Sequence, residues 1–277
     1  MNVIRRGPVM LAYNGWGDAA TGPEVVLLHG LAGWSGEWAP TVEWLSATHQ
    51  VVALDQRGHG HSTRRPDDVS RAAYVKDVIA LIETLHTGPV VLVGHSLGGH
   101  TAMLLAAQRP DLVDRLVVVE ATPERDAEAP ERVRRWLSSW PIPFRSRSSA
   151  VDFFDTLGYF RSALAAKTWA AGLDERRDGL WSRFDIDVMV EALREVAAND
   201  YWDQWRAIRC PTLVVRGEHG SVSSEQADQM LERLSGTDLI EIADAGHDVH
   251  LDQPNRWCNA MTSFLRNTPG STTSFNR

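Results

Sequence analysis

The chain has 277 residues, 43% of them hydrophobic, and a formal net charge of −8. This length accommodates one large α/β domain, or a core domain with an inserted subdomain. The acidic balance and the absence of a Lys/Arg cluster argue against a nucleic-acid surface, and no apolar run is long enough to span a bilayer. The two cysteines, Cys210 and Cys258, lack metal-ligand spacing, and so few thiols suggest a reducing compartment. Because the N-terminal stretch also lacks the apolar segment of a signal peptide, we expect a cytoplasmic protein.

Strands and helices alternate through the first 120 residues. Short apolar runs, some continuous and β-branched as in buried parallel strands, predict strands at 3–6, 10–13, 24–28, 50–54, 90–93 and 116–119. Apolar residues at helical spacing predict helices at 38–46, 71–85 and 100–108. These segments form the first part of a core domain, over residues 1–120.

The strand rhythm stops between residues 121 and 206. This stretch is charged and aromatic, and helices are expected in it at 131–140, 150–157, 161–171 and 187–198. Strands resume at 211–215 and 238–242, followed by a helix at 255–266. We therefore expect a helical lid over 121–206, a second core segment over 207–268 and a disordered tail at 269–277. The alternation predicts an α/β fold with a mostly parallel, doubly wound sheet, whose ligands bind beyond the carboxyl ends of the strands.

The most informative motif is Gly94-His-Ser96-Leu-Gly98, which joins the strand at 90–93 to the helix at 100–108. This is the Gly-x-Ser-x-Gly pattern of a nucleophile elbow, in its strand–turn–helix context. The sharp turn lifts the Ser96 hydroxyl off the end of the sheet, and a Cβ at either glycine would crowd it. The turn also aims the N–H of Leu97 at the space beside the serine oxygen, where the helix dipole favours negative charge. Ser96 is therefore the candidate nucleophile.

A serine nucleophile needs a general base, and the base needs a third group to orient it. The best base is His247, which follows the last predicted strand and precedes the last helix. Its loop can therefore fold over the sheet end that carries Ser96. The other candidates are weaker, because His95 and His100 flank the elbow and are expected to pack rather than react.

Five segments together resemble the α/β-hydrolase family, in particular its lid-bearing esterases and C–C hydrolases. They are His29-Gly-Leu31, Asp55-Gln-Arg57-Gly-His-Gly-His-Ser62, Gly94-His-Ser96-Leu-Gly-Gly99, Pro211-Thr-Leu-Val-Val-Arg-Gly217 and Ala245-Gly-His247. The match covers the core from Val3 to about residue 266, but not the lid. The resemblance implies that the backbone N–H groups of Leu31 and Leu97 form the oxyanion hole. Asp55 and Arg57 are expected to form a structural ion pair below the site.

The sequence departs from the family at the catalytic acid. Family members usually carry an Asp after the Pro-Thr-Leu-Val-Val strand, but that position here is Gly220. Other members place the acid at the end of the strand that follows the elbow helix, where this chain has Glu120. A glutamate supplies the extra methylene needed to reach the base from there, so Glu120 is the first choice for the acid and Glu218 the second. The missing side chain at Gly220 is expected to leave room in the pocket.

Eleven tryptophans are an unusual number for a chain of this size. Ordinary core packing explains the set as a whole, but those in the middle of the chain favour an aromatic-walled pocket equally well. The candidate substrate-binding residues are Trp34, Trp136, Trp140, Trp181 and Trp202.

The motifs favour a serine hydrolase that cleaves an ester or lactone bond of a medium-sized hydrophobic substrate through an acyl-enzyme. The resemblance leaves two alternatives open. One is a C–C bond hydrolase or cofactor-free oxygenase on the same scaffold, and the other is a non-catalytic protein that binds a small molecule. We expect a small-molecule substrate as the partner, with no cofactor, no metal, no nucleic acid and no membrane, and a homo-oligomer is compatible with the sequence.

Overall fold

The computed structural model describes residues 1–17, 23–85, 88–158 and 160–266, so the tail expected at 269–277 lies outside the described residues. Eight strands form one sheet in the order β1-β2-β4-β3-β5-β6-β9-β10. Only the pairings of β1 with β2 and of β2 with β4 are antiparallel. The strands are β1 (Asn2–Arg6), β2 (Val9–Trp16), β3 (Val25–Leu28), β4 (Val51–Leu54), β5 (Val90–His95), β6 (Val113–Val119), β9 (Thr212–Gly217) and β10 (Thr237–Ile242). The prediction of a mostly parallel α/β sheet is confirmed.

Helices cover both faces of this sheet because its central strands are apolar on both sides. Along β3, Val25 and Leu27 pack into one apolar cluster, and Val26 and Leu28 pack into another. On one face lie α2 (Arg71–Leu85), α3 (Leu97–Gln108), α9 (Trp202–Ala207) and α10 (Ser224–Arg233); on the other lie α1 (Ala39–Leu45), α11 (Val249–Asp252) and α12 (Pro254–Arg266). Two 3₁₀ turns, η1 (Ser35–Trp38) and η2 (Pro110–Leu112), complete the core. This two-sided burial explains the continuous Val/Leu runs of the sequence.

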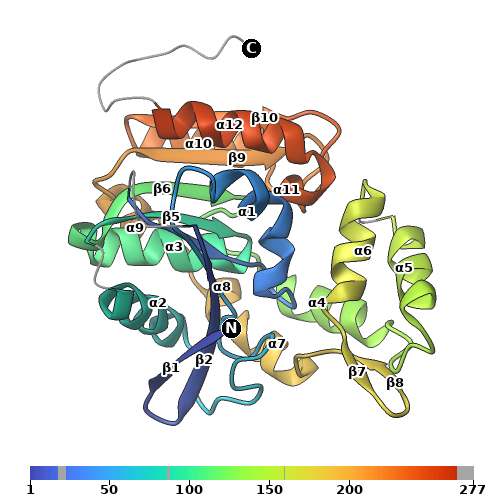
Figure 1. Cartoon of the computed structure of the whole chain (residues 1–277). Helices are drawn as coiled ribbons and strands as arrows, with labels where there is room; N and C mark the ends of the chain where they lie inside the picture. The colour runs from blue at the N-terminus through green and yellow to red at the C-terminus, as the bar shows by residue number, and fades with distance from the viewer. Residues whose placement is uncertain (18–22, 86–87, 159, 267–277) are drawn as a thin grey trace.

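The segment between β6 and β9 forms most of a separate helical layer, drawn in yellow-green and yellow at the side of the sheet (Figure 1). Its elements are α4 (Ala129–Ser138), α5 (Arg147–Thr156), α6 (Ala163–Ala171), β7 (Asp174–Arg176), β8 (Gly179–Trp181), α7 (Ile186–Ala192) and α8 (Arg194–Ala198). The hairpin of β7 and β8 was not expected from the sequence, because three-residue strands show no periodicity. No helix within the described ranges is both long and apolar enough to cross a membrane.

Helix α9, which begins inside the predicted lid segment 121–206, packs on the core instead. Trp205 is fully buried in the cluster under α2 and α3, and its indole N–H donates to the Met230 carbonyl at 2.8 Å. Trp202 packs against the same cluster, and the Arg233 guanidinium lies 4.2 Å from its ring centroid. The structural lid therefore ends before α9.

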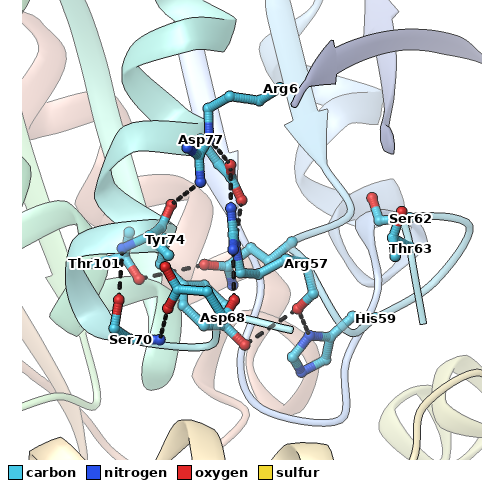
Figure 2. Close-up of polar contacts among 12 residues, drawn as sticks. Arg6, Arg57, His59, Ser62, Thr63, Asp68, Ser70, Tyr74, Asp77 and Thr101 are labelled. Atoms are coloured by element: carbon cyan, nitrogen blue, oxygen red, sulfur yellow. Dashed lines mark hydrogen bonds and ion pairs between the residues drawn. The ribbon is translucent and has the colours of Figure 1, made fainter. Parts of the chain in front are cut away.

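The ion pair expected between Asp55 and Arg57 does not form. Arg57 instead pairs with Asp77 of α2, with its Nε and Nη2 each 2.6 Å from a carboxylate oxygen, and both side chains are buried (Figure 2). The Asp55 carboxylate accepts the backbone N–H groups of Ser35 and His61, at 2.6 and 2.8 Å. The prediction was wrong because Asp77 offers both oxygens to the planar guanidinium from another element, a geometry that strengthens such pairs.

Candidate active site

Ser96 lies on a strained turn between β5 and α3. Its φ is 51° and its ψ is −115°, a backbone conformation that non-glycine residues rarely adopt. A Cβ at Gly94 would lie 2.2 Å from the Gly98 carbonyl oxygen, and one at Gly98 would lie 2.4 Å from the Leu28 carbonyl oxygen. The two glycines therefore let the chain turn sharply at the sheet end, with Ser96 at the apex and the first turn of α3 directly after it.

The loop after β3 approaches the elbow closely. A Cβ built at Gly30 would lie 3.4 Å from the Cβ of Ser96. The Gln56 N–H donates to His29 Nε2 at 3.0 Å, so His29 carries its proton on Nδ1 and donates to the Gly30 carbonyl at 2.7 Å. In a trans peptide the N–H of Leu31 points opposite to that carbonyl. His29 therefore fixes the direction of the N–H that the sequence assigned to the oxyanion hole.

Glu120 and His247 lie in contact at the carboxyl ends of β6 and β10. The Glu120 Oε2 atom is 3.2 Å from His247 Nδ1, so Nε2 remains on the side of the ring away from the carboxylate. The Glu120 side chain is fully buried, whereas that of His247 is 39% exposed. A buried carboxylate on Nδ1 of a partly exposed imidazole is the arrangement that a general base needs.

The loop after β9 surrounds the Glu120 carboxylate with donors. Oε1 accepts the N–H of Gly217 at 2.7 Å, and Oε2 accepts the N–H and hydroxyl of Ser221 at 2.6 and 3.0 Å and the N–H of Val222 at 3.3 Å. Burial raises the pKa of this carboxyl, but His247 and these N–H groups outweigh it and hold the pKa below its usual value. Glu120 is therefore an ionised acceptor at neutral pH.

Two neighbours of Glu120 show what the sequence did not predict. Ser221 Oγ lies 2.9 Å from His247 Nδ1, so it contacts both the acid and the base; only its place after Gly220 in the sequence could have signalled this. A Cβ at Gly220 would lie 2.1 Å from Glu120 Oε1. The space expected to enlarge the pocket at Gly220 is therefore filled by the acid itself.

Glu218, the second choice for the acid, faces elsewhere. Its carboxylate accepts the Asp244 N–H at 2.9 Å and lies 3.8 Å from His219 Nε2, and about half of the side chain is exposed. These contacts place it on the outer side of the loop, away from the pair formed by Glu120 and His247.

His95, the residue before Ser96, ties the elbow to the loop of the base. Its Nε2 donates to the His247 carbonyl at 2.9 Å, and the two rings lie 4.7 Å apart. Burial lowers the pKa of His95, but the Glu37 carboxylate, 3.7 Å from Nδ1, and the partners on Nε2 outweigh it and raise the pKa. The turn of Ser96 and the loop of His247 are thus held together by His95.

The lid is attached to the same base loop. Helix α6 and the residues before it make three hydrogen bonds to that loop: Arg161 N–H to Asp252 at 2.9 Å, Ser162 Oγ to the Leu251 carbonyl at 2.8 Å, and Trp169 Nε1 to Asp248 at 2.6 Å. Asp252 also accepts the N–H of Gly246, the residue before His247, at 2.9 Å. The helical layer and the loop of His247 are therefore joined by one set of hydrogen bonds.

The structure separates the five tryptophans assigned to substrate binding. Trp136 and Trp140 belong to the aromatic cluster of the lid, which also contacts Leu31. Trp34 packs against Gly36 and Gly172 and so joins the loop after β3 to the end of α6. Trp181 bonds Asp178 on the hairpin of β7 and β8. Trp202 packs on the sheet core under Arg233 instead of joining the aromatic cluster of Trp136 and Trp140.

Comparisons with known proteins agree with this architecture. Residues 23–254 match the family model described as alpha/beta hydrolase fold. The (E)-2-((N-methylformamido)methylene)succinate hydrolase of Acinetobacter baylyi is 30% identical, over 91% of this chain and 94% of its own. The sn-1-specific diacylglycerol lipase ABHD11 of Mus musculus is 31% identical, over 93% and 86%.

Among solved structures, E-2-(acetamidomethylene)succinate hydrolase superimposes with a TM-score of 0.87 at 26% identity, covering 96% of this chain and all of the other. The family match covers most of the chain, and the relatives are named as hydrolases or lipases. Both findings agree with the sheet order and with the serine turn between two glycines. The chain belongs to the α/β-hydrolase family and is a hydrolase.

Proposed function

We propose that this protein is a serine hydrolase that cleaves an ester or lactone bond of a medium-sized hydrophobic substrate. The observation that carries the proposal is the contact of 3.2 Å between the buried Glu120 carboxylate and His247 Nδ1. His247 in turn is held beside the residue that precedes Ser96. A serine on a strained elbow, a histidine and a buried carboxylate form the set that acyl transfer requires.

The proposed reaction begins when Ser96 Oγ attacks the substrate carbonyl carbon while His247 Nε2 takes the hydroxyl proton. The carbonyl oxygen becomes an oxyanion, which the N–H groups of Leu31 and Leu97 stabilise. The intermediate collapses as His247 gives the proton to the leaving alkoxide, leaving Ser96 acylated. Water, deprotonated by His247, then attacks the acyl carbon, and Ser96 recovers the proton as the acid is released. Glu120 remains ionised and stabilises the imidazolium in both halves of the reaction.

The names of the relatives support hydrolysis but span different substrates. One is named for a succinate derivative and another for a diacylglycerol. The helical layer favours an apolar substrate, because its Trp136 and Trp140 share an aromatic cluster with Leu31. A C–C hydrolase or oxygenase and a non-catalytic binding protein remain the alternative proposals.

Labelling with a fluorophosphonate, followed by peptide mass spectrometry, tests the nucleophile. Modification of Ser96 in the wild type and none in Ser96→Ala is expected, together with a Ser96-dependent burst on 4-nitrophenyl butyrate. Complete inertness toward both reagents would overturn the esterase proposal and favour a binding protein.

The acid is tested by Glu120→Gln, with Glu218→Gln as its matched control. Glu120→Gln is expected to lower kcat about 10³- to 10⁴-fold, because the amide no longer holds the required imidazole tautomer. Glu218→Gln should stay within about twofold, because surface changes away from a site have small effects. The reverse pattern would transfer the role of acid to Glu218.

A further inference from the structure

The first residue of α2 buries a guanidinium whose hydrogen-bonding capacity is only partly used. Arg71 is 2% exposed. Its Nη2 donates to the Leu97 carbonyl at 3.3 Å and to the Thr101 hydroxyl. Its Nε and Nη1 are buried and find no acceptor among the described residues. A guanidinium carries five N–H donors and keeps its charge at any physiological pH, so such orphaned donors are costly.

No carboxylate of the described residues hydrogen-bonds this guanidinium. The Tyr74 ring packs 4.5 Å from it, and the nearby Glu195 carboxylate accepts the backbone N–H of Arg71 rather than the guanidinium. His100 of α3 is also buried, and neither of its ring nitrogens has a partner within the described part of the chain. Tyr201 meets the His100 ring edge-on at 4.5 Å. Arg71 bonds Leu97 and Thr101 at the start of α3, and His100 precedes Thr101 on the same helix. Buried donors without acceptors beside a positive charge are features of an anion site.

This site adjoins the proposed catalytic centre through one residue. Leu97 offers its N–H to the proposed oxyanion hole, and its carbonyl accepts from Arg71. Leu97 and Tyr74 form a small apolar cluster with Leu31 and with Leu193 of the lid region. The cluster thus includes both proposed oxyanion residues and the ring that packs on the guanidinium. A substrate bound at Ser96 and extending over Leu97 would bring its acyl end towards Arg71.

We propose that Arg71 and His100 bind an anionic group, and that the natural ester or lactone carries a carboxylate on its acyl side that fits there. The part that concerns the substrate rests on the proposed esterase function. The carboxylate would accept from the free Nε and Nη1 of Arg71 in the bidentate arrangement that suits a guanidinium, and from one N–H of His100. The aromatic lid would then face the alcohol side of the substrate.

Two esters that differ only at the far carboxyl group test the substrate. Mono(4-nitrophenyl) succinate carries a free carboxylate, and methyl 4-nitrophenyl succinate carries a neutral ester in its place. The wild type is expected to favour the anionic ester by about tenfold or more in kcat/KM, because the neutral ester leaves the charged donors unpaired. Arg71→Met should abolish the preference, and Arg71→Lys, which keeps the charge, should retain part of it. The exposed Arg194→Met is the control and should retain all of it.

Thermal unfolding in chloride, phosphate, acetate and succinate at constant ionic strength tests the anion site without turnover. Stabilisation by succinate in the wild type, lost in Arg71→Met, supports the proposal, and His100→Gln gives a second test should Arg71→Met not fold. Stabilisation by inorganic anions alone, without the ester preference, would support an anion site and overturn the proposal that the substrate carries a carboxylate bound there. An equal loss of kcat/KM on both esters, with no anion effect on unfolding, would overturn the proposal.

These outcomes are distinguishable from failure of the esterase proposal. If Ser96 neither labels nor turns over either ester, the proposed function fails, while the unfolding titration still judges Arg71.

Discussion

Alanine at position 220 would force the Glu120 carboxylate out of its binding position. The new Cβ would lie 2.1 Å from Oε1 and 2.4 Å from the carboxyl carbon, whereas non-bonded heavy atoms settle at roughly 3.5–4.0 Å. The backbone at Gly220 lies outside the left-handed region, so alanine brings no left-handed strain there, and the nearest atoms that its Cβ meets all belong to Glu120. The carboxylate must therefore move by more than 1 Å, roughly the difference between these distances.

Such a shift breaks the contact with His247 Nδ1, which is already 3.2 Å long. A hydrogen bond to a charged group contributes about 1.5–3 kcal/mol, and each 1.4 kcal/mol on the barrier is roughly a tenfold change in rate. Gly220→Ala is therefore expected to lower kcat/KM on a 4-nitrophenyl ester by about 10- to 100-fold. Gly15→Ala is the control, because its Cβ would meet neighbours at ordinary contacts of 3.9 and 4.0 Å.

A double-mutant cycle with Glu120→Ala separates this clash from a general loss of structure. Once the carboxylate is gone, Gly220→Ala should cause no further loss of kcat/KM. The double variant should therefore be as active as Glu120→Ala alone, and the coupling energy should equal the whole cost of Gly220→Ala in the wild type. Replacing Gly220 by Asp in the Glu120→Ala background should recover at least about tenfold in kcat/KM, because an acid then again contacts the base. Full additivity, together with no recovery, would refute the argument that Glu120 occupies the space at position 220.

Three further predictions concern stability and the pocket. Asp77→Asn leaves the buried Arg57 guanidinium without its counter-charge and should cost about 3–5 kcal/mol in urea unfolding; a loss below about 1 kcal/mol, the value of an exposed pair, would contradict this. Burial, with the neighbouring His29 in support, lowers the pKa of His59 to about 3. Below pH 6.5 the unfolded chain therefore binds a proton that the folded state excludes, and stability should fall by up to about 1.4 kcal/mol per pH unit as the pH drops towards 3. His59→Gln should show a shallower fall in urea titrations at pH 7 to 4, and an unchanged slope would count against the buried neutral imidazole. Trp202→Ala should lower the unfolding midpoint and leave the KM for 4-nitrophenyl butyrate unchanged, whereas Trp136→Ala should raise that KM. Equal effects of the two variants on KM would contradict the distinction between a core and a lid tryptophan.

The features that were predicted from the sequence are those that depend on residues close together in the chain. The strand–turn–helix context of Ser96 and the loop of His247 each lie in one continuous stretch of chain, where spacing and glycines report backbone geometry directly. Glu120 was predicted as the partner of His247 because some family members carry the acid at the end of the strand that follows the elbow helix, where this chain has a glutamate. The contact between them is present, and its catalytic role stays a prediction.

Features that depend on which elements pack together were missed or mistaken. Arg57 takes its counter-charge from Asp77 on α2, and the lone pattern around Asp55 gave no sign of it. Ser221 contacts Glu120 only because β9 lies beside β6 in the sheet. The core position of Trp202 follows from α9 packing on α3, which no local spacing encodes.

The hydrogen bonds between α6 and the base loop have a consequence for lid exchange within the family. A chimera that grafts a foreign lid onto this core would lose Trp169, Ser162 or the backbone of Arg161 as donors, leaving Asp248 and Asp252 to reorganise. Because Asp252 also holds the residue before the base, such a graft would disturb turnover as well as selectivity. Recombination of new substrate ranges onto this scaffold should therefore succeed when the segment around 161–171 is inherited together with 246–252 from one parent.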